Sequence, residues 1–174
     1  RLSRGDWAVK TQAWAEMSAT ADHLRLQARL VAWEGDNKIF ERHFDEKVDL
    51  VGITTLTSTA PRAYEIADKF REKKVPVIMG GIHASALPQE ASLHADAVVI
   101  GEAEATMQEL LKDFKNGNLQ KIYSSSERPS LINLPLPRKD LLFGNKFYRE
   151  MDLVQTTRGC PFGCDFCSVS DFFG

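Results

Sequence analysis

Three short, mainly apolar runs in the middle of the chain are each followed by a loop and then by a helical pattern. The runs are 48–53, 75–79 and 96–100, and each contains several β-branched residues. Continuous apolar runs of this length are typical of strands that are buried on both faces. Their alternation with helices predicts an α/β fold, namely a Rossmann-like, doubly wound parallel sheet with right-handed crossovers and helices on both faces.

The helices between these runs have recognisable ends and faces. Thr59 is a predicted N-cap, and Pro61 suits the first helical turn. An apolar stripe then runs from Ala63 to Phe70, and the charged segment Arg71-Glu72-Lys73-Lys74 is predicted to form a solvated helix end. Further helices are predicted over 87–93 and 105–114, and a last short strand at 122–123.

Three loops are expected at the carboxyl edge of this sheet, where doubly wound folds bind ligands. They span 54–59, 80–85 and 101–104, and all are rich in small or polar residues. Paired glycines at a strand end either make a turn or let a bulky ligand approach the backbone. The threonines either cap the next helix or bind a ligand. Glu102 either accepts a ligand hydrogen bond or lies solvated at a helix N-terminus.

Composition excludes several classes of protein. The chain has 174 residues, 43% apolar and 26% charged, which suits one hydrophobic core and a little more. The net charge of −2 offers no broad basic surface, so no nucleic-acid partner is expected. No apolar run approaches the ~18–20 residues that span a bilayer, so no transmembrane segment is expected. Without a recognisable signal peptide, the cytoplasm is the expected compartment.

All three cysteines lie near the end of the chain, as Cys160-x3-Cys164-x2-Cys167. An odd, closely spaced set favours a metal centre or a reactive thiol over structural disulfides. Closed zinc sites need four ligands, and no fourth cysteine is present. Iron–sulfur clusters usually have four thiolates, so three would leave one iron open. A structural zinc site stays as the alternative.

This cysteine motif, with Phe166 before its last cysteine, resembles the signature of the radical S-adenosylmethionine (radical SAM) family. The resemblance implies that Cys160, Cys164 and Cys167 hold a 4Fe-4S cluster. It also implies that the open iron binds S-adenosylmethionine, with Phe166 near the adenosyl group. Reductive cleavage would then release a 5′-deoxyadenosyl radical, which requires an electron donor.

The upstream segments Val51-Gly52-Ile53-Thr54-Thr55, Met79-Gly80-Gly81-Ile82-His83 and Ile100-Gly101-Glu102-Ala103-Glu104 resemble the cobalamin-binding domain of one radical SAM branch. That branch includes methyltransferases that act on unactivated carbon, hopanoid methylases among them. The resemblance implies cobalamin contacts from Thr54, Thr55, Leu56, Thr57, Gly80, Gly81, His83, Gly101 and Glu102. The Asp-x-His-x-x-Gly motif of many cobalamin-binding domains is missing, which implies a cobalt with no histidine beneath it.

The expected organisation is a cobalamin-binding domain over 1–123 with an atypical helix at 1–22, a linker over 124–152, and the start of a radical SAM domain over 153–174. The first strand of its partial barrel is expected at 154–158. The expected reaction is methyl transfer to a small-molecule substrate, and the chain by itself is expected to be inactive. Two alternatives are a radical SAM enzyme of other chemistry with a vestigial cobalamin domain, and a non-enzymatic α/β module with structural zinc.

Overall fold

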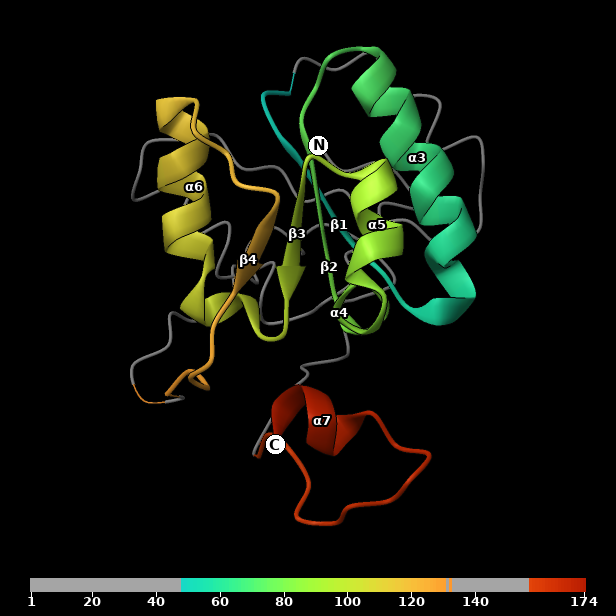
Figure 1. Cartoon of the computed structure of the whole chain (residues 1–174), viewed down its shortest axis with the longest axis vertical. Coiled ribbons are helices and arrows are strands. Elements are labelled where there is room, and N and C mark those ends of the chain that lie inside the picture. Colours follow the sequence, from blue (N-terminus) through green and yellow to red (C-terminus); the bar gives the residue numbers. More distant parts are fainter. Residues whose placement is uncertain (1–47, 131, 133–156) are drawn as a thin grey trace, which may run out of the picture. The chain divides into compact units, whose positions relative to one another are not determined.

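The computed structural model describes residues 48–130, 132 and 157–174. Contacts divide the chain into two compact units, and nearly all described residues lie in the one formed by 48–129 and 156–174. This unit contains a four-stranded sheet with its helices and the segment that carries the cysteines (Figure 1).

Three predictions fall on other parts of the chain. The helix at 1–22 and most of the linker at 124–152 lie outside the described residues, as do residues 154–156 of the strand predicted at 154–158. Residues 157 and 158 are described, and they do not lie in a strand. The domain boundaries derived from the sequence stay predictions.

The sheet is parallel throughout its described strands. These strands are β1 (Val51–Thr54), β2 (Val77–Gly80), β3 (Ala97–Ile100) and β4 (Ile122–Ser124). They lie in the order β1-β2-β3-β4, with Ile53 paired to Met79 and Val99 paired to Tyr123. Adjacent parallel strands require crossover connections, and helices supply them here. The predicted α/β fold with a parallel sheet is therefore confirmed.

The helices connect the strands and cover the sheet. They are α3 (Ala60–Glu72), α4 (Ile82–Ala86), α5 (Pro88–His94) and α6 (Met107–Asn116), with 3-10 turns η1 (Thr57–Thr59) and η2 (Ala103–Ala105) and a last helix α7 (Val169–Phe173). Helix α3 packs on β1 and β2, α5 packs on β2 and β3, and the two helices contact each other. They therefore share one face of the sheet (Figure 1). No described helix is long and apolar enough to cross a membrane.

The core forms where the apolar stripes of the helices meet the strands. Val77, Met79 and Val98 are fully buried in the sheet, and Leu110 is fully buried on α6. The stripe predicted on α3 is also buried: Ala63, Ile66, Ala67 and Phe70. Complete burial of one such aliphatic side chain contributes about 1.5–3 kcal/mol, so this interior fixes the sheet that positions the loops.

The N-terminus of α3 lies where the sequence predicts it. Thr59 occupies the N-cap position, but its hydroxyl makes no cap hydrogen bond to α3. Its Oγ1 instead accepts from the Leu56 N–H at 3.2 Å and donates to the Leu56 carbonyl at 3.1 Å. The η1 turn before the helix offers these nearer partners, so Thr59 is the N-cap residue that the sequence predicts, while its hydroxyl bonds within the turn.

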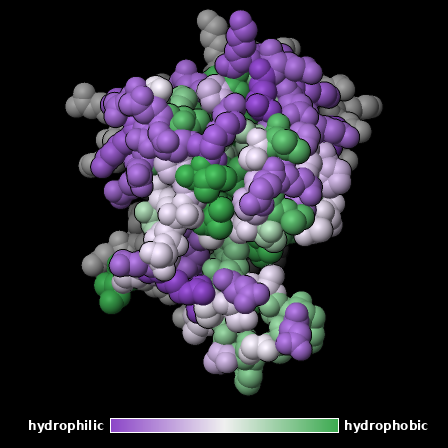
Figure 2. Space-filling view, in the orientation of Figure 1, coloured by the Kyte–Doolittle hydropathy of each residue, from purple (hydrophilic) through white to green (hydrophobic). Residues whose placement is uncertain are grey.

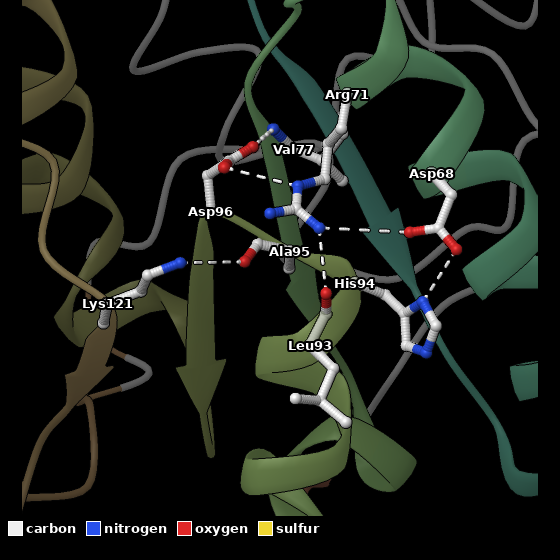
Figure 3. Close-up of polar contacts among 8 residues, drawn as sticks. All are labelled: Asp68, Arg71, Val77, Leu93, His94, Ala95, Asp96 and Lys121. Atoms are coloured by element: carbon white, nitrogen blue, oxygen red, sulfur yellow. Dashed lines mark hydrogen bonds and ion pairs between the residues drawn. The ribbon is translucent and has the colours of Figure 1, made fainter.

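A polar network joins the amino ends of β2 and β3 to two helices (Figure 3). Asp96 Oδ2 accepts from the Val77 N–H at 2.9 Å, and the Asp96 N–H donates to the Val77 carbonyl at 2.8 Å. Arg71 lies 3.4 Å from Asp96 Oδ1 and donates to the Leu93 carbonyl at 2.9 Å. Arg71 thus ties α3 to α5 and β3, which corrects its prediction as part of a solvated helix end.

Thr55 and Gly81 form a tight joint at the carboxyl ends of β1 and β2. The Thr55 N–H donates to the Gly80 carbonyl at 2.8 Å, and the His83 N–H donates to the Thr55 carbonyl at 3.1 Å. Thr55 Oγ1 also donates to the Gly80 carbonyl and accepts from the Ala84 N–H. Gly81 has φ +95°, and a Cβ there would lie 2.6 Å from Thr54 Oγ1 and 2.9 Å from the Thr55 carbonyl oxygen.

The Asp96 network predicts a graded loss of stability. Asp96→Ala removes the acceptor for the Val77 N–H and the partner of Arg71, so we expect the free energy of unfolding to fall by about 1–3 kcal/mol. Asp96→Asn keeps an acceptor oxygen and serves as the matched variant, with a smaller loss. Urea unfolding followed by far-ultraviolet circular dichroism measures both. Equal stability of Asp96→Ala and the parent chain would contradict this role.

The two glycines at the end of β2 are predicted to respond differently to alanine. Gly81→Ala forces a side chain into a backbone region that only glycine readily adopts and into the Thr54–Thr55 loop, so we expect a loss of about 2–4 kcal/mol. Gly80→Ala is the control, because its Cβ would meet Val99 at an ordinary 3.6 Å. Thermal unfolding should separate the variants, and equal midpoints would refute the argument.

Candidate cofactor-binding edge and cysteine loop

The carboxyl ends of β1, β2 and β3 lie at one edge of the parallel sheet, as the sequence predicts. This places the loops after Thr54, Gly80 and Ile100 at the same edge, which we call the cofactor edge. The predicted contact residues do not all have the same freedom there. Some of these residues are already engaged in contacts within the protein, and others face open space.

Thr55 and Gly81 belong to the first group. Thr55 is 1% exposed, and its hydroxyl already has two backbone partners. The space beside Gly81 is filled by Thr54 and Thr55, so this glycine serves the packing of the protein itself. Thr55 and Gly81 therefore hold the loops at this edge together and are not free to contact a ligand.

Gly101 and Leu56 belong to the second group, whereas Thr57 is exposed but also bonded, with its Oγ1 3.3 Å from His83 Nδ1. Gly101 has φ +79°, and a Cβ there would meet nothing within 4 Å. Its N–H donates to Ser85 Oγ at 2.9 Å, which fixes the backbone beside that open space. Leu56 is 54% exposed, and Thr57 is exposed on the η1 turn. Backbone at Gly101 and an apolar side chain at Leu56 are therefore available to a bulky ligand.

His83 is buried and engaged on both ring nitrogens. Its Nε2 lies 3.0 Å from the Tyr64 hydroxyl, and its Nδ1 lies 3.3 Å from Thr57 Oγ1. Glu90 Oε1 is 3.6 Å from Nε2. Burial, followed by the hydrogen bond and charge of Glu90, raises the pKa of Tyr64 to about 12, so the phenol stays protonated at neutral pH. His83 is thus a hydrogen-bonded partner of the loop and leaves no free nitrogen for a metal.

Glu102 lies where the sequence puts it, just after β3, but it is neither solvated nor free. Its Oε1 is 2.6 Å from an Arg158 guanidinium nitrogen, and Glu104 Oε1 is 2.5 Å from the same nitrogen. Burial alone would lower the pKa of Arg158, but the hydrogen bonds and charges of Glu102 and Glu104 outweigh it and raise this pKa. Sequence reasoning missed Arg158. Two features of the sequence could have suggested this ion pair: the acidic residues Glu102 and Glu104 follow a strand, and an arginine lies two residues before Cys160.

Thr106 is a second residue that the sequence analysis did not single out. It occupies the N-cap position of α6, next to the loop that carries Glu102, and it is 3% exposed. Its Oγ1 is buried without a hydrogen-bond partner in the described structure. A buried hydroxyl in this state costs about 1–3 kcal/mol, which marks the α6 end of the cofactor edge as incompletely satisfied.

The cysteine loop presents three free thiols. Cys164 is exposed, whereas Cys160 and Cys167 are half-buried. The Cys160 N–H donates to the Gly174 carbonyl at 2.8 Å, and the Cys167 N–H donates to the Cys164 carbonyl at 3.0 Å. Within the described residues, no three His, Cys, Asp or Glu side chains are gathered closely enough to hold a metal ion. The donor set suits an iron–sulfur cluster chemically, since three unpaired thiols lie within eight residues of one loop.

Large apolar side chains near the cysteines reach the surface. Phe166 is 93% exposed and Phe162 is 71% exposed. Elsewhere, in the face shown in Figure 2, hydrophobic residues lie among hydrophilic ones. Single exposed apolar residues are ordinary on protein surfaces, but an aromatic exposed to this degree inside a thiol loop is free to pack against a ligand.

The cofactor edge and its strands match a known family model, the B12 binding domain, over residues 18–111. Curated relatives include two proteins of Chlorobaculum tepidum. The bacteriochlorophyllide d C-8(2)-methyltransferase is 38% identical over 79% of this chain and 33% of its own length. The bacteriochlorophyllide d C-12(1)-methyltransferase is 33% identical over 72% of this chain and 28% of its own length. The hopanoid C-2 methylase of Rhodopseudomonas palustris is 25% identical over 72% of this chain and 24% of its own. The chain thus spans a third or less of these relatives.

The family match begins upstream of β1 and ends within α6, so it includes the three edge loops. It covers more than half of the 174 residues. The resemblance to a cobalamin-binding domain that the strand-end motifs predicted is therefore confirmed. The chain belongs to the B12-binding domain family.

Proposed function

We propose that this chain is the N-terminal part of a cobalamin-dependent radical SAM methyltransferase. One observation carries the proposal: a B12-binding domain is followed, in the same chain, by three free cysteines in the spacing Cys-x3-Cys-x2-Cys. Relatives named as methyltransferases align with most of this chain, which supports methyl transfer over other radical chemistry.

At the cofactor edge, the chain's residues would bind cobalamin and hold it in place. Gly101 offers backbone beside open space, and Leu56 offers an exposed apolar surface for the corrin or its tail. The contacts between Thr55 and Gly81 would keep the loops rigid when cobalamin is bound. Because Tyr64 and Thr57 occupy the ring nitrogens of His83, this chain would bind cobalamin without using that histidine as a cobalt ligand.

On the cysteine loop, Cys160, Cys164 and Cys167 would hold a 4Fe-4S cluster as thiolates. Phe166 is exposed and would pack against S-adenosylmethionine. When bound, cobalamin supplies a transferable methyl group, and the cluster with S-adenosylmethionine supplies the one-electron chemistry that activates an unreactive carbon. A small-molecule substrate and an electron donor complete the proposed reaction.

Cobalamin binding is testable at Gly101. Titration of the chain with hydroxocobalamin, followed by visible absorption, should show saturable binding. Gly101→Asn tolerates a positive φ but fills the open space, so we expect the affinity to fall by about tenfold or more. Gly117→Asn is the matched control, because Gly117 also has a positive φ and open space but ends α6.

The outcomes of that titration have distinct meanings. Binding that Gly101→Asn weakens and Gly117→Asn leaves within twofold supports cobalamin at the cofactor edge. Equal affinity of both variants for hydroxocobalamin would indicate that cobalamin binds to another part of the chain. No binding by the parent chain would contradict a cobalamin-dependent reaction and favour a vestigial domain.

The cluster is testable by anaerobic reconstitution with iron and sulfide. We expect a brown product with iron and sulfide in the proportion of a 4Fe-4S cluster, and loss of it in Cys164→Ala. Ser168→Ala is the control, because Ser168 neighbours Cys167 and makes no side-chain cap bond to α7. A colourless chain that retains one equivalent of zinc would instead support the structural zinc module.

A further inference from the structure

One guanidinium joins two carboxylates in the described structure, and all three side chains are buried. The side chain of Arg158 is 7% exposed, that of Glu102 is 5% exposed and that of Glu104 is 4% exposed. A single nitrogen of Arg158 lies 2.6 Å from Glu102 Oε1 and 2.5 Å from Glu104 Oε1. We call these three residues the ion-pair triad.

Burial makes the triad different from an ordinary surface ion pair. An exposed pair contributes little and is easily exchanged for water. A buried charge, by contrast, depends on its partner, because removal of one partner strands the other away from solvent. Two carboxylates also face a single guanidinium, so both attract Arg158 and keep its side chain between them. The triad therefore fixes a position more surely than it adds stability.

The triad joins two segments that are more than fifty residues apart in sequence. Glu102 directly follows Gly101, whose N–H is held by Ser85, and Glu104 lies in the η2 turn. On the other side, Arg158 is separated from Cys160 by Gly159 alone. The triad therefore connects the end of β3 to the first cysteine of the loop.

The link between Arg158 and Cys160 leaves little slack. Gly159 has φ +86°, and a Cβ there would lie 2.2 Å from the Gly174 carbonyl oxygen. The same carbonyl accepts the Cys160 N–H at 2.8 Å. Because the backbone at Gly159 is confined in this way, a fixed position of Arg158 also fixes the position of Cys160.

We propose that Arg158, held by Glu102 and Glu104, is a positioning residue that fixes Cys160 at the end of β3. The proposal rests on the proposed function in one respect, namely that Cys160 is a cluster ligand. Arg158 touches neither substrate nor cofactor in this role. It places the loop that would bind the cluster next to the edge that would bind cobalamin.

The first test measures thiol accessibility in the metal-free chain. The chain is treated with iodoacetamide, the labelled cysteines are resolved by mass spectrometry, and a pH series normalises each rate to its thiolate fraction. In Arg158→Gln we expect the rate at half-buried Cys160, relative to exposed Cys164, to rise about tenfold. Arg128→Gln is the matched control, because Arg128 also contacts this segment, at the Phe172 carbonyl, but through an exposed bond.

A neutral variant guards against simple unfolding. Arg158→Gln strands two buried carboxylates, so the triple variant Glu102→Gln, Glu104→Gln, Arg158→Met removes the charges together. We expect it to fold as the parent does and still to show the faster labelling of Cys160. The proposal is overturned if the Cys160 to Cys164 ratio stays within twofold of the parent in both variants, or if Arg128→Gln raises it equally.

The second test uses the reduction potential of the reconstituted cluster. Loss of a nearby cation in Arg158→Gln should make the potential more negative, and loss of two anions in Glu102→Gln, Glu104→Gln should make it more positive. A merely loosened loop would shift both potentials in the same direction, and that result would overturn the proposal. If no cluster assembles, the proposed function fails, while the labelling result still decides the role of Arg158.

Discussion

The hydrogen bonds of Thr55 hold together the part of the sheet on which every other feature of the site depends. Its backbone N–H and its hydroxyl both donate to the Gly80 carbonyl, and its carbonyl and hydroxyl both accept from the start of α4. The joint closes only because Gly81 carries no side chain. Burial removes water as a competitor, so these bonds cannot be exchanged cheaply. The cofactor edge is therefore built on a rigid base, and its open space lies further along at Gly101.

Charge is used at the two ends of the strands for different purposes. At the amino ends, Asp96 and Arg71 join β2 and β3 to the helices, in partly exposed positions that stabilise the fold. At the carboxyl end of β3, Glu102 and Glu104 face Arg158 in a buried position. Burial raises the cost of separating those charges. The second arrangement therefore suits a task of positioning, next to the proposed cluster ligand Cys160.

The predictable and unpredictable parts of the site divide by the range of the interaction. The three strands, the apolar stripe of α3 and the loops at the carboxyl edge follow from local periodicity and turn residues, and the structure has them close to their predicted positions. Helix α4 was not predicted, because its five residues are too few to show a period. The hydroxyl of Thr59 turned to Leu56 because a 3-10 turn stood between loop and helix. Arg71 looked solvated because Asp96, its partner, is 25 residues away.

The sequence by itself determined that this chain forms a parallel α/β sheet with small-residue loops at one edge, and that three closely spaced thiols follow it. Those properties depend on residues that are neighbours in the chain, so spacing and composition reveal them. Only the tertiary structure decided which loop residues are free. It closed Thr55, Gly81 and His83 into internal contacts, left Gly101 open, and paired Arg158 with Glu102 and Glu104. Those outcomes depend on side chains brought together from distant segments and on their burial, which no local pattern records.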